Sequence, residues 1–140
     1  MEVRPGESFP VLELVEYRLG NLDFAVARLG PNAAGDLPGA AFGRLVVAVE
    51  DIADEEAMLC IIQHPNGSPK KVEAGPMQSN VGGQISYDSL DTQGGSSGSP
   101  IVSLTGEIVG VHTNGGCTAF SGFNFGVAVM AIRGASSHMP

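Results

Sequence analysis

A serine enclosed by glycines is the feature of this sequence whose residue types and spacing could do chemistry. Residues 91–100 read Asp-Thr-Gln-Gly-Gly-Ser-Ser-Gly-Ser-Pro. Because glycine adopts positive φ without strain, such a segment can turn tightly and direct successive backbone N–H groups into one concavity. Fixed donors of this kind stabilise the negative charge that develops on a carbonyl oxygen under attack. The segment therefore predicts an oxyanion-binding turn with a serine hydroxyl beside it.

Two other interpretations of this segment fit its surroundings less well. A flexible Gly/Ser linker is disfavoured because the segment is short, ends in Pro100 and leads directly into the apolar residues 101–104. The nucleophile turn of α/β-hydrolases also places a serine between glycines, but a helix must follow it. Here a proline and β-branched residues follow, so we expect a strand instead.

Short apolar runs bounded by turn residues predict strands along most of the chain. Glycine accounts for 20 of 140 residues, about twice its average share, as expected for many tight turns. Asn66-Gly67 and Thr105-Gly106 predict two of these turns, and a short helix is expected near residues 128–133. The fold class is therefore all-β, a barrel or a sandwich. The expected strands cover residues 12–18, 22–29, 45–49, 58–63, 83–87, 101–104, 107–112 and 123–129.

Composition excludes several classes of partner. The net charge of −8 disfavours a surface that neutralises phosphates, so no nucleic acid is expected as a partner. Apolar runs reach only five or six residues, far short of the roughly 18 that a membrane helix needs, so no membrane partner is expected. The three histidines and two cysteines lack metal-ligand spacing, so we expect no metal and no cofactor. Cys60 is interpreted as a small buried hydrophobe, and its pairing with Cys117 stays open.

The segment Gly-Ser-Ser-Gly-Ser-Pro, residues 95–100, resembles the nucleophile loop of trypsin-like serine peptidases with the chymotrypsin fold. It is most similar to the bacterial branch that includes the staphylococcal V8-type glutamyl endopeptidases. The resemblance implies that Ser97 is the nucleophile and that the backbone N–H groups of Gly95 and Ser97 form the oxyanion hole. Residues 21–29 resemble the stretch that carries the triad aspartate, which implies that role for Asp23. The implied activity is hydrolysis of peptide or protein substrates through an acyl-enzyme.

The resemblance also leaves two readings of substrate specificity. Asp91 lies six residues before Ser97, where trypsins hold the acid that selects Arg or Lys. Thr92 and His112 instead match the positions where V8-type enzymes bind a glutamate side chain, and both can donate to a carboxylate. We favour an acidic P1 residue, the residue before the cleaved bond, with Asp91 pointing elsewhere. Residues 108–116 resemble the strand that lines this pocket, which adds Thr113, Asn114 and Gly115 as substrate-binding candidates.

The resemblance implies how the chain is organised. Residues 1–36 are expected to be a remnant of a first β-barrel that carries the triad aspartate. Residues 37–133 are expected to form a second antiparallel β-barrel with the nucleophile loop and a short C-terminal helix. Residues 134–140 are expected to be a disordered tail.

The chain departs from the family at the general base. The family's histidine lies roughly 45 residues upstream of the aspartate, whereas the 22 residues before Asp23 contain none. His64, His112 and His138 all follow Asp23. We expect a truncated peptidase that is inactive by itself and that pairs with the missing N-terminal segment or another chain.

One alternative function stays open. A catalytically dead homologue could bind extended peptides or proteins by β-augmentation along residues 111–115. Such a homologue would be free to lose the glycines and serine of residues 94–98, which are all present here. Their presence favours the peptidase.

Overall fold

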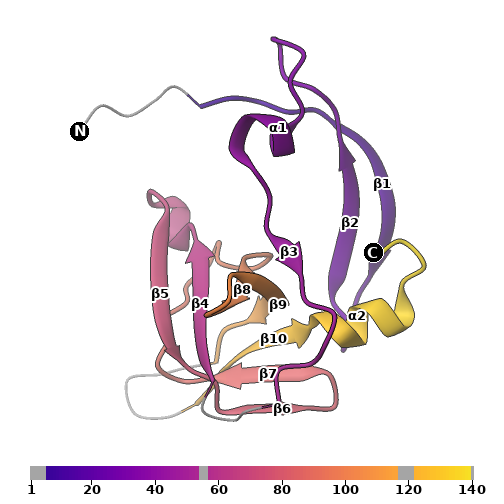
Figure 1. Cartoon of the computed structure of the whole chain (residues 1–140). Coiled ribbons are helices and arrows are strands. Elements are labelled where there is room, and N and C mark those ends of the chain that lie inside the picture. Colours follow the sequence, from indigo (N-terminus) through magenta and orange to yellow (C-terminus); the bar gives the residue numbers. More distant parts are fainter. Residues whose placement is uncertain (1–5, 54–56, 117–121, 140) are drawn as a thin grey trace.

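Two sheets of unequal size make up the fold, which a computed structural model describes for residues 6–53, 57–116 and 122–139 (Figure 1). The smaller sheet is an antiparallel hairpin of β1 (Val11–Arg18) and β2 (Phe24–Leu29). Two α-helices, α1 (Pro38–Phe42) and α2 (Val129–Ala135), and a 3₁₀ turn at Pro65–Gly67 complete the described elements. The larger sheet has eight strands: β3 (Val46–Val47), β4 (Met58–Gln63), β5 (Lys71–Pro76), β6 (Ser79–Val81), β7 (Gln84–Tyr87), β8 (Pro100–Ser103), β9 (Glu107–Asn114) and β10 (Asn124–Ala128).

The larger sheet is strongly curled (Figure 1). Its inward side chains form the main apolar core. Its strands follow the order β5-β4-β8-β9-β10-β7-β6 with antiparallel neighbours, while β3 runs parallel to β9. Inward side chains alternate with outward ones along β4, as the two-residue period of a strand requires. The all-β prediction is therefore confirmed. The core contains Leu59, Ile61, Met77, Ile85, Tyr87, Leu90, Ile101, Val109 and Val129.

The two turns predicted from sequence connect the strands as expected. Asn66 and Gly67, at φ of 53° and 69°, join β4 to β5, and Gly106, at φ of 85°, lies between β8 and β9. Both predictions succeed because Gly and Asn tolerate positive φ, which is a local property of these residues.

Other elements differ from the sequence-based expectations. Strands β5 and β6 were not predicted, since their polar residues, glycine and proline lack an apolar pattern; β5 forms along the edge that β4 offers it. The strand expected over residues 45–49 is only Val46–Val47.

Helix α2 continues through Gly134 and Ala135, which corrects their assignment to a disordered tail. Cys60 is half-buried, and Cys117 lies outside the described residues.

A second apolar cluster attaches the β1–β2 hairpin to the larger sheet. Phe24 of β2 packs with Val127 of β10 and Ile132 of α2, and all three side chains are buried. The hairpin also holds the end of α2 directly, because the Arg18 guanidinium donates to the Ala135 carbonyl at 2.6 Å. None of the helices in the described ranges is long and apolar enough to span a membrane.

Close packing between β9 and β10 requires glycine. A Cβ added to Gly126 would lie 2.6 Å from the Val111 carbonyl oxygen and 2.3 Å from the Ile101 side chain. At Gly110, an added Cβ would lie 2.9 Å from the Val127 carbonyl oxygen. Because the obstructing atoms include backbone, the two strands cannot accommodate a methyl group without moving apart.

We expect Gly126→Ala to lower the free energy of unfolding by about 1–3 kcal/mol, the usual cost of overpacking a core. Chemical denaturation monitored by circular dichroism measures this change. Gly134→Ala is the matched control, because Gly134 is helical and a Cβ there meets nothing within 4 Å. This control should be neutral or stabilising, since alanine favours helix. Equal stability of the two variants would contradict the proposed close packing.

Candidate active site

The serine loop consists of two consecutive four-residue turns, each closed by a backbone hydrogen bond. The Ser96 amide donates to the Gln93 carbonyl at 3.0 Å, and the Ser99 amide donates to the Ser96 carbonyl at 3.1 Å. Gly95 and Gly98 occupy the third position of these turns at φ of 92° and 85°. Residues with a Cβ rarely adopt such angles. The glycine spacing read from the sequence therefore determines the shape of this loop.

Two neighbouring segments hold the loop in place. The Gly98 amide donates to the His112 carbonyl at 2.8 Å, and the His112 amide donates to the Ser99 carbonyl at 2.9 Å. On the other side, the Asn66 amide donates to the Gly94 carbonyl at 2.7 Å. The loop is thus held between β9 and the β4–β5 turn.

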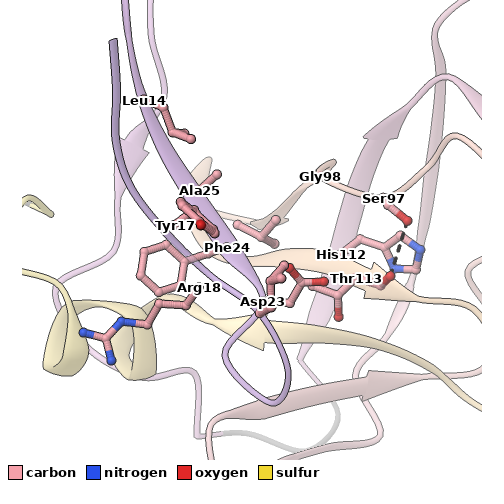
Figure 2. Close-up of a pocket in the computed structure, with 12 residues that line it drawn as sticks. Leu14, Tyr17, Arg18, Asp23, Phe24, Ala25, Ser97, Gly98, His112 and Thr113 are labelled. Carbon is pink, nitrogen blue, oxygen red and sulfur yellow. Dashed lines mark hydrogen bonds between the residues drawn. The ribbon is translucent and has the colours of Figure 1, made fainter.

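Ser97 is exposed at the centre of this loop, and its hydroxyl donates to the Thr113 carbonyl at 3.3 Å (Figure 2). Within the described ranges, neither the Gly95 nor the Ser97 backbone amide has an intramolecular acceptor. Both N–H groups are therefore available to an oxygen atom of a ligand.

A cleft of about 580 Å³ brings Ser97 together with Asp23. Asp23 is exposed and lies in the turn immediately before β2, next to the buried Phe24. Since Phe24 packs against β10 and α2, the same contact that attaches the hairpin also places the Asp23 carboxylate on this cleft (Figure 2).

A second cavity, of about 430 Å³, also has Ser97 in its lining. Ser97 and His112 are the two residues that line both spaces. Among the residues that the structure describes, those that line the second cavity include no Asp, Glu, Lys or Arg, although the whole chain carries a net charge of −8. The lining consists of Thr92, Gln93, Gly94, Ser97, His112, Gly115, Gly116 and Asn124.

The walls of the second cavity are tied together by the buried Asn124. Its side-chain oxygen accepts from the Gly116 amide at 3.0 Å, and its side-chain nitrogen donates to the Leu90 carbonyl at 2.8 Å. Thr92 Oγ1 is buried and has no hydrogen-bond partner among the residues that the structure describes. A buried hydroxyl without a partner is costly, and Thr92 is one of the residues that line this cavity.

His112 is almost completely buried, with 2% of its surface exposed. Its Nδ1 forms a 2.5 Å hydrogen bond with the hydroxyl of Tyr87 on β7. Burial lowers the pKa of the imidazole below its usual value, and the nearby carbonyl of Phe125 opposes this shift only in part. The ring is therefore neutral at pH 7.

The structure brings most of the sequence-predicted residues to one place. Thr92, His112 and Gly115 line the second cavity, and Thr113 lines the first cleft together with Asp23. Asp91 and Asn114 are exposed and line neither space. Of the three histidines only His112 lines either space; the His64 ring instead bonds to the Ser68 carbonyl at 3.1 Å.

Sequence analysis missed the polar residues that support the site. The Gln63 side chain donates to the Asp91 carbonyl at 2.7 Å, and the Asn66 side chain donates to Gln93 Oε1 at 2.6 Å. Tyr87 and Asn124 were included in expected strands only as parts of an apolar pattern. Polar residues within apolar strands were the one available signal, and it does not indicate which groups they meet.

We expect the buried neutral His112 to make stability depend on pH. Because its pKa is lower in the folded chain, the unfolded chain binds more protons below about pH 6.5. Stability is then complete above that pH and decreases as the pH falls, by at most about 1.4 kcal/mol per pH unit. The measurement is urea unfolding at several pH values for the wild type and His112→Gln.

The carboxylates contribute equally to the pH dependence of stability in both proteins. Their contribution therefore cancels when the unfolding free energy of His112→Gln is subtracted from that of the wild type at each pH. The difference in unfolding free energy, wild type minus His112→Gln, should therefore rise between pH 5 and pH 7. Parallel curves would show that His112 is not buried in its neutral form.

Comparisons with known proteins identify the family and the fold of this chain. The model of the trypsin-like peptidase domain matches residues 3–111. Two inactive-form crystal structures of the protease Rv3671c from M. tuberculosis H37Rv are similar, one of them a serine-to-alanine mutant. Their TM-scores are 0.61 and 0.60, and their identities are 17% and 16%. The matches cover 96% and 91% of this chain and 68% and 63% of those chains.

A structure of a Glu endopeptidase in complex with MPD is also similar, with a TM-score of 0.59 and 21% identity over 82% of this chain and 56% of that one. No curated protein matches. This chain thus spans between 56% and 68% of the lengths of these three structures, with which it shares a fold. The chymotrypsin-like fold predicted from the sequence is confirmed, and the chain belongs to the family of trypsin-like peptidase domains.

Proposed function

We propose that this chain carries the nucleophile, the oxyanion hole and the specificity cavity of a serine endopeptidase. The observation that supports this proposal most directly is the position of Ser97. This exposed residue lines both a cleft that is also lined by Asp23 and a cavity that is also lined by Thr92 and whose described lining is uncharged. An extended peptide can place a carbonyl at Ser97 while its preceding side chain enters the cavity.

The proposed chemistry follows from this placement. Ser97 Oγ attacks the peptide carbonyl carbon and gives its proton to a base, while the carbonyl oxygen becomes an oxyanion. The unpaired amides of Gly95 and Ser97 donate to that oxyanion, and one such donor contributes about 3–4 kcal/mol. The C–N bond then breaks, the amine leaves with the proton, and water hydrolyses the ester on Ser97.

We assign the general base to a histidine outside these 140 residues. His64 and His138 line neither space, and His112 Nδ1 is bonded to Tyr87. The Ser97 proton points to the Thr113 carbonyl, which cannot act as a base. The cleft between Asp23 and Ser97, about 580 Å³, has room for an imidazole ring from another segment.

The exposed apolar side chains of the hairpin support a missing first barrel. Val11, Leu12, Leu14 and Tyr17 of β1 are all exposed, although β1 has the composition of a packed strand. We propose that residues 1–36 are the remnant of a first barrel, and that this face pairs with an N-terminal segment or another chain.

We expect the isolated chain to hydrolyse no peptide substrate at a measurable rate. Free imidazole should enter the cleft and raise the Ser97-dependent hydrolysis of an N-acyl-glutamate p-nitrophenyl ester by on the order of 10²-fold. Spectrophotometric release of p-nitrophenol over an imidazole titration measures this rate.

Ser97→Ala provides the background rate of imidazole itself. Ser97-dependent peptide hydrolysis without imidazole would show that this chain contains its own base. The same imidazole-dependent rate in the wild type and in Ser97→Ala would show that Ser97 is not the nucleophile.

We further propose that the cavity accepts an acidic P1 side chain. Within the described part of the chain, its lining offers the unpaired Thr92 hydroxyl and the His112 imidazole, and it includes no acid that would attract Arg or Lys. Asp91, the acid at the trypsin position, is exposed outside the cavity. A carboxylate would give the buried Thr92 hydroxyl the acceptor it lacks.

A peptide that ends in glutamate should bind this chain about tenfold more tightly than one that ends in arginine, as measured by calorimetry. Thr92→Val should weaken binding of the glutamate peptide about tenfold by removing a hydrogen bond to a charged group. Thr105→Val, the same change in the β8–β9 turn, is the control and should leave binding unchanged. Tighter binding of the arginine peptide would refute the acidic specificity.

A further inference from the structure

One buried polar contact of the second cavity has no part in the chemistry described above. Tyr87 is the largest fully buried side chain of the described residues, with 0% of its surface exposed. It ends β7, and its hydroxyl meets His112 Nδ1 on β9, so the contact passes over β10, which pairs with both strands. The ring centroids of Tyr87 and His112 lie 6.0 Å apart.

The direction of this hydrogen bond decides what His112 can offer a ligand. A neutral imidazole carries one N–H, so a proton donated to Nδ1 by the tyrosine leaves the N–H at Nε2. The reverse direction would leave Nε2 as an acceptor, which would repel a carboxylate. The Phe125 carbonyl near the ring can only accept, which is compatible with a proton on Nε2 when the tyrosine hydroxyl donates to Nδ1.

We infer that Tyr87 is a positioning residue that holds His112 as a neutral Nε2–H donor, so that the second cavity recognises a carboxylate without a positive charge. The inference rests on the proposed acidic specificity of this cavity. Nε2 is the ring nitrogen that Tyr87 leaves for the cavity, where the unpaired Thr92 hydroxyl supplies a second neutral donor.

The surroundings of His112 are consistent with a neutral donor. The Tyr87 hydroxyl is hydrogen-bonded to the ring, and the charged residues that line the first cleft together with His112 are Asp23 and Arg18 of the hairpin. None of the residues lining the second cavity is charged. An uncharged hydrogen-bond pair is cheaper to bury here than an imidazolium, since no charge has to be desolvated.

Nitrogen-15 NMR of the histidine rings tests the tautomer directly. In the wild type we expect the His112 proton on Nε2, with Nδ1 unprotonated and hydrogen-bonded, between pH 6.5 and pH 8. Tyr87→Phe keeps the buried ring but removes the hydroxyl, and should produce a mixture of the two tautomers. Thr105→Val removes an exposed hydroxyl from the β8–β9 turn and should leave the His112 signals unchanged.

Binding of matched peptides shows whether the tautomer matters for recognition. Tyr87→Phe should weaken binding of a glutamate-ended peptide about fivefold to tenfold, as expected for a misdirected hydrogen bond. The matched control is the same peptide with glutamine in place of the terminal glutamate. Its binding should be unchanged in Tyr87→Phe, because an amide can donate to an unprotonated Nε2 or accept from Nε2–H. A structural defect would weaken both peptides alike and would overturn the positioning role.

The wild-type spectrum decides the inference even if Tyr87→Phe fails to fold. A His112 proton on Nδ1, or a doubly protonated ring at pH 7, would overturn it. An Nε2–H ring in a wild type that prefers the arginine peptide would overturn the acidic specificity and confirm the tautomer assignment, so the two failures are distinguishable.

Discussion

Two backbone hydrogen bonds between the serine loop and His112 are the constraint on which the rest of the site depends. They join the Gly98 amide to the His112 carbonyl and the His112 amide to the Ser99 carbonyl. Because Ser97 lies in the bonded loop and His112 lies on β9, these two bonds place the exposed hydroxyl between two spaces. A loop free of β9 would lose its position relative to the cleft and the cavity at once.

The loop can make these bonds because its own shape is set locally. Gly95 and Gly98 adopt angles that other residues avoid, so the turns form with little conformational choice. The strands beneath it are held by close contacts, with Gly126 lying against the Val111 carbonyl. A tight loop on a tightly packed pair of strands holds the amides of Gly95 and Ser97 in fixed positions, and such preorganisation is what the proposed oxyanion hole requires.

The charge distribution separates the recognition cavity from the rest of the surface. The chain is acidic overall, yet the second cavity contains only neutral groups, and Asp91 lies outside it. The acidic substrate that we propose would therefore have to be attracted by hydrogen-bond donors close to its carboxylate rather than by the long-range field, which is repulsive. Burial keeps His112 neutral, and its contact with Tyr87 gives the ring a defined orientation.

The sequence by itself determined the fold class, the serine loop and its turns, because these follow from local properties. Glycines at residues 95 and 98 and the Asn66-Gly67 pair act through their own backbone angles. The sequence could not predict β5, whose polar residues become a strand only beside β4, or the partners of Gln63, Tyr87 and Asn124. Tyr87 and His112 lie 25 residues apart and meet only because β10 brings β7 and β9 to its two sides. Tertiary structure alone decides such contacts, since a hydrogen bond depends on the distance between two groups that the chain order does not specify.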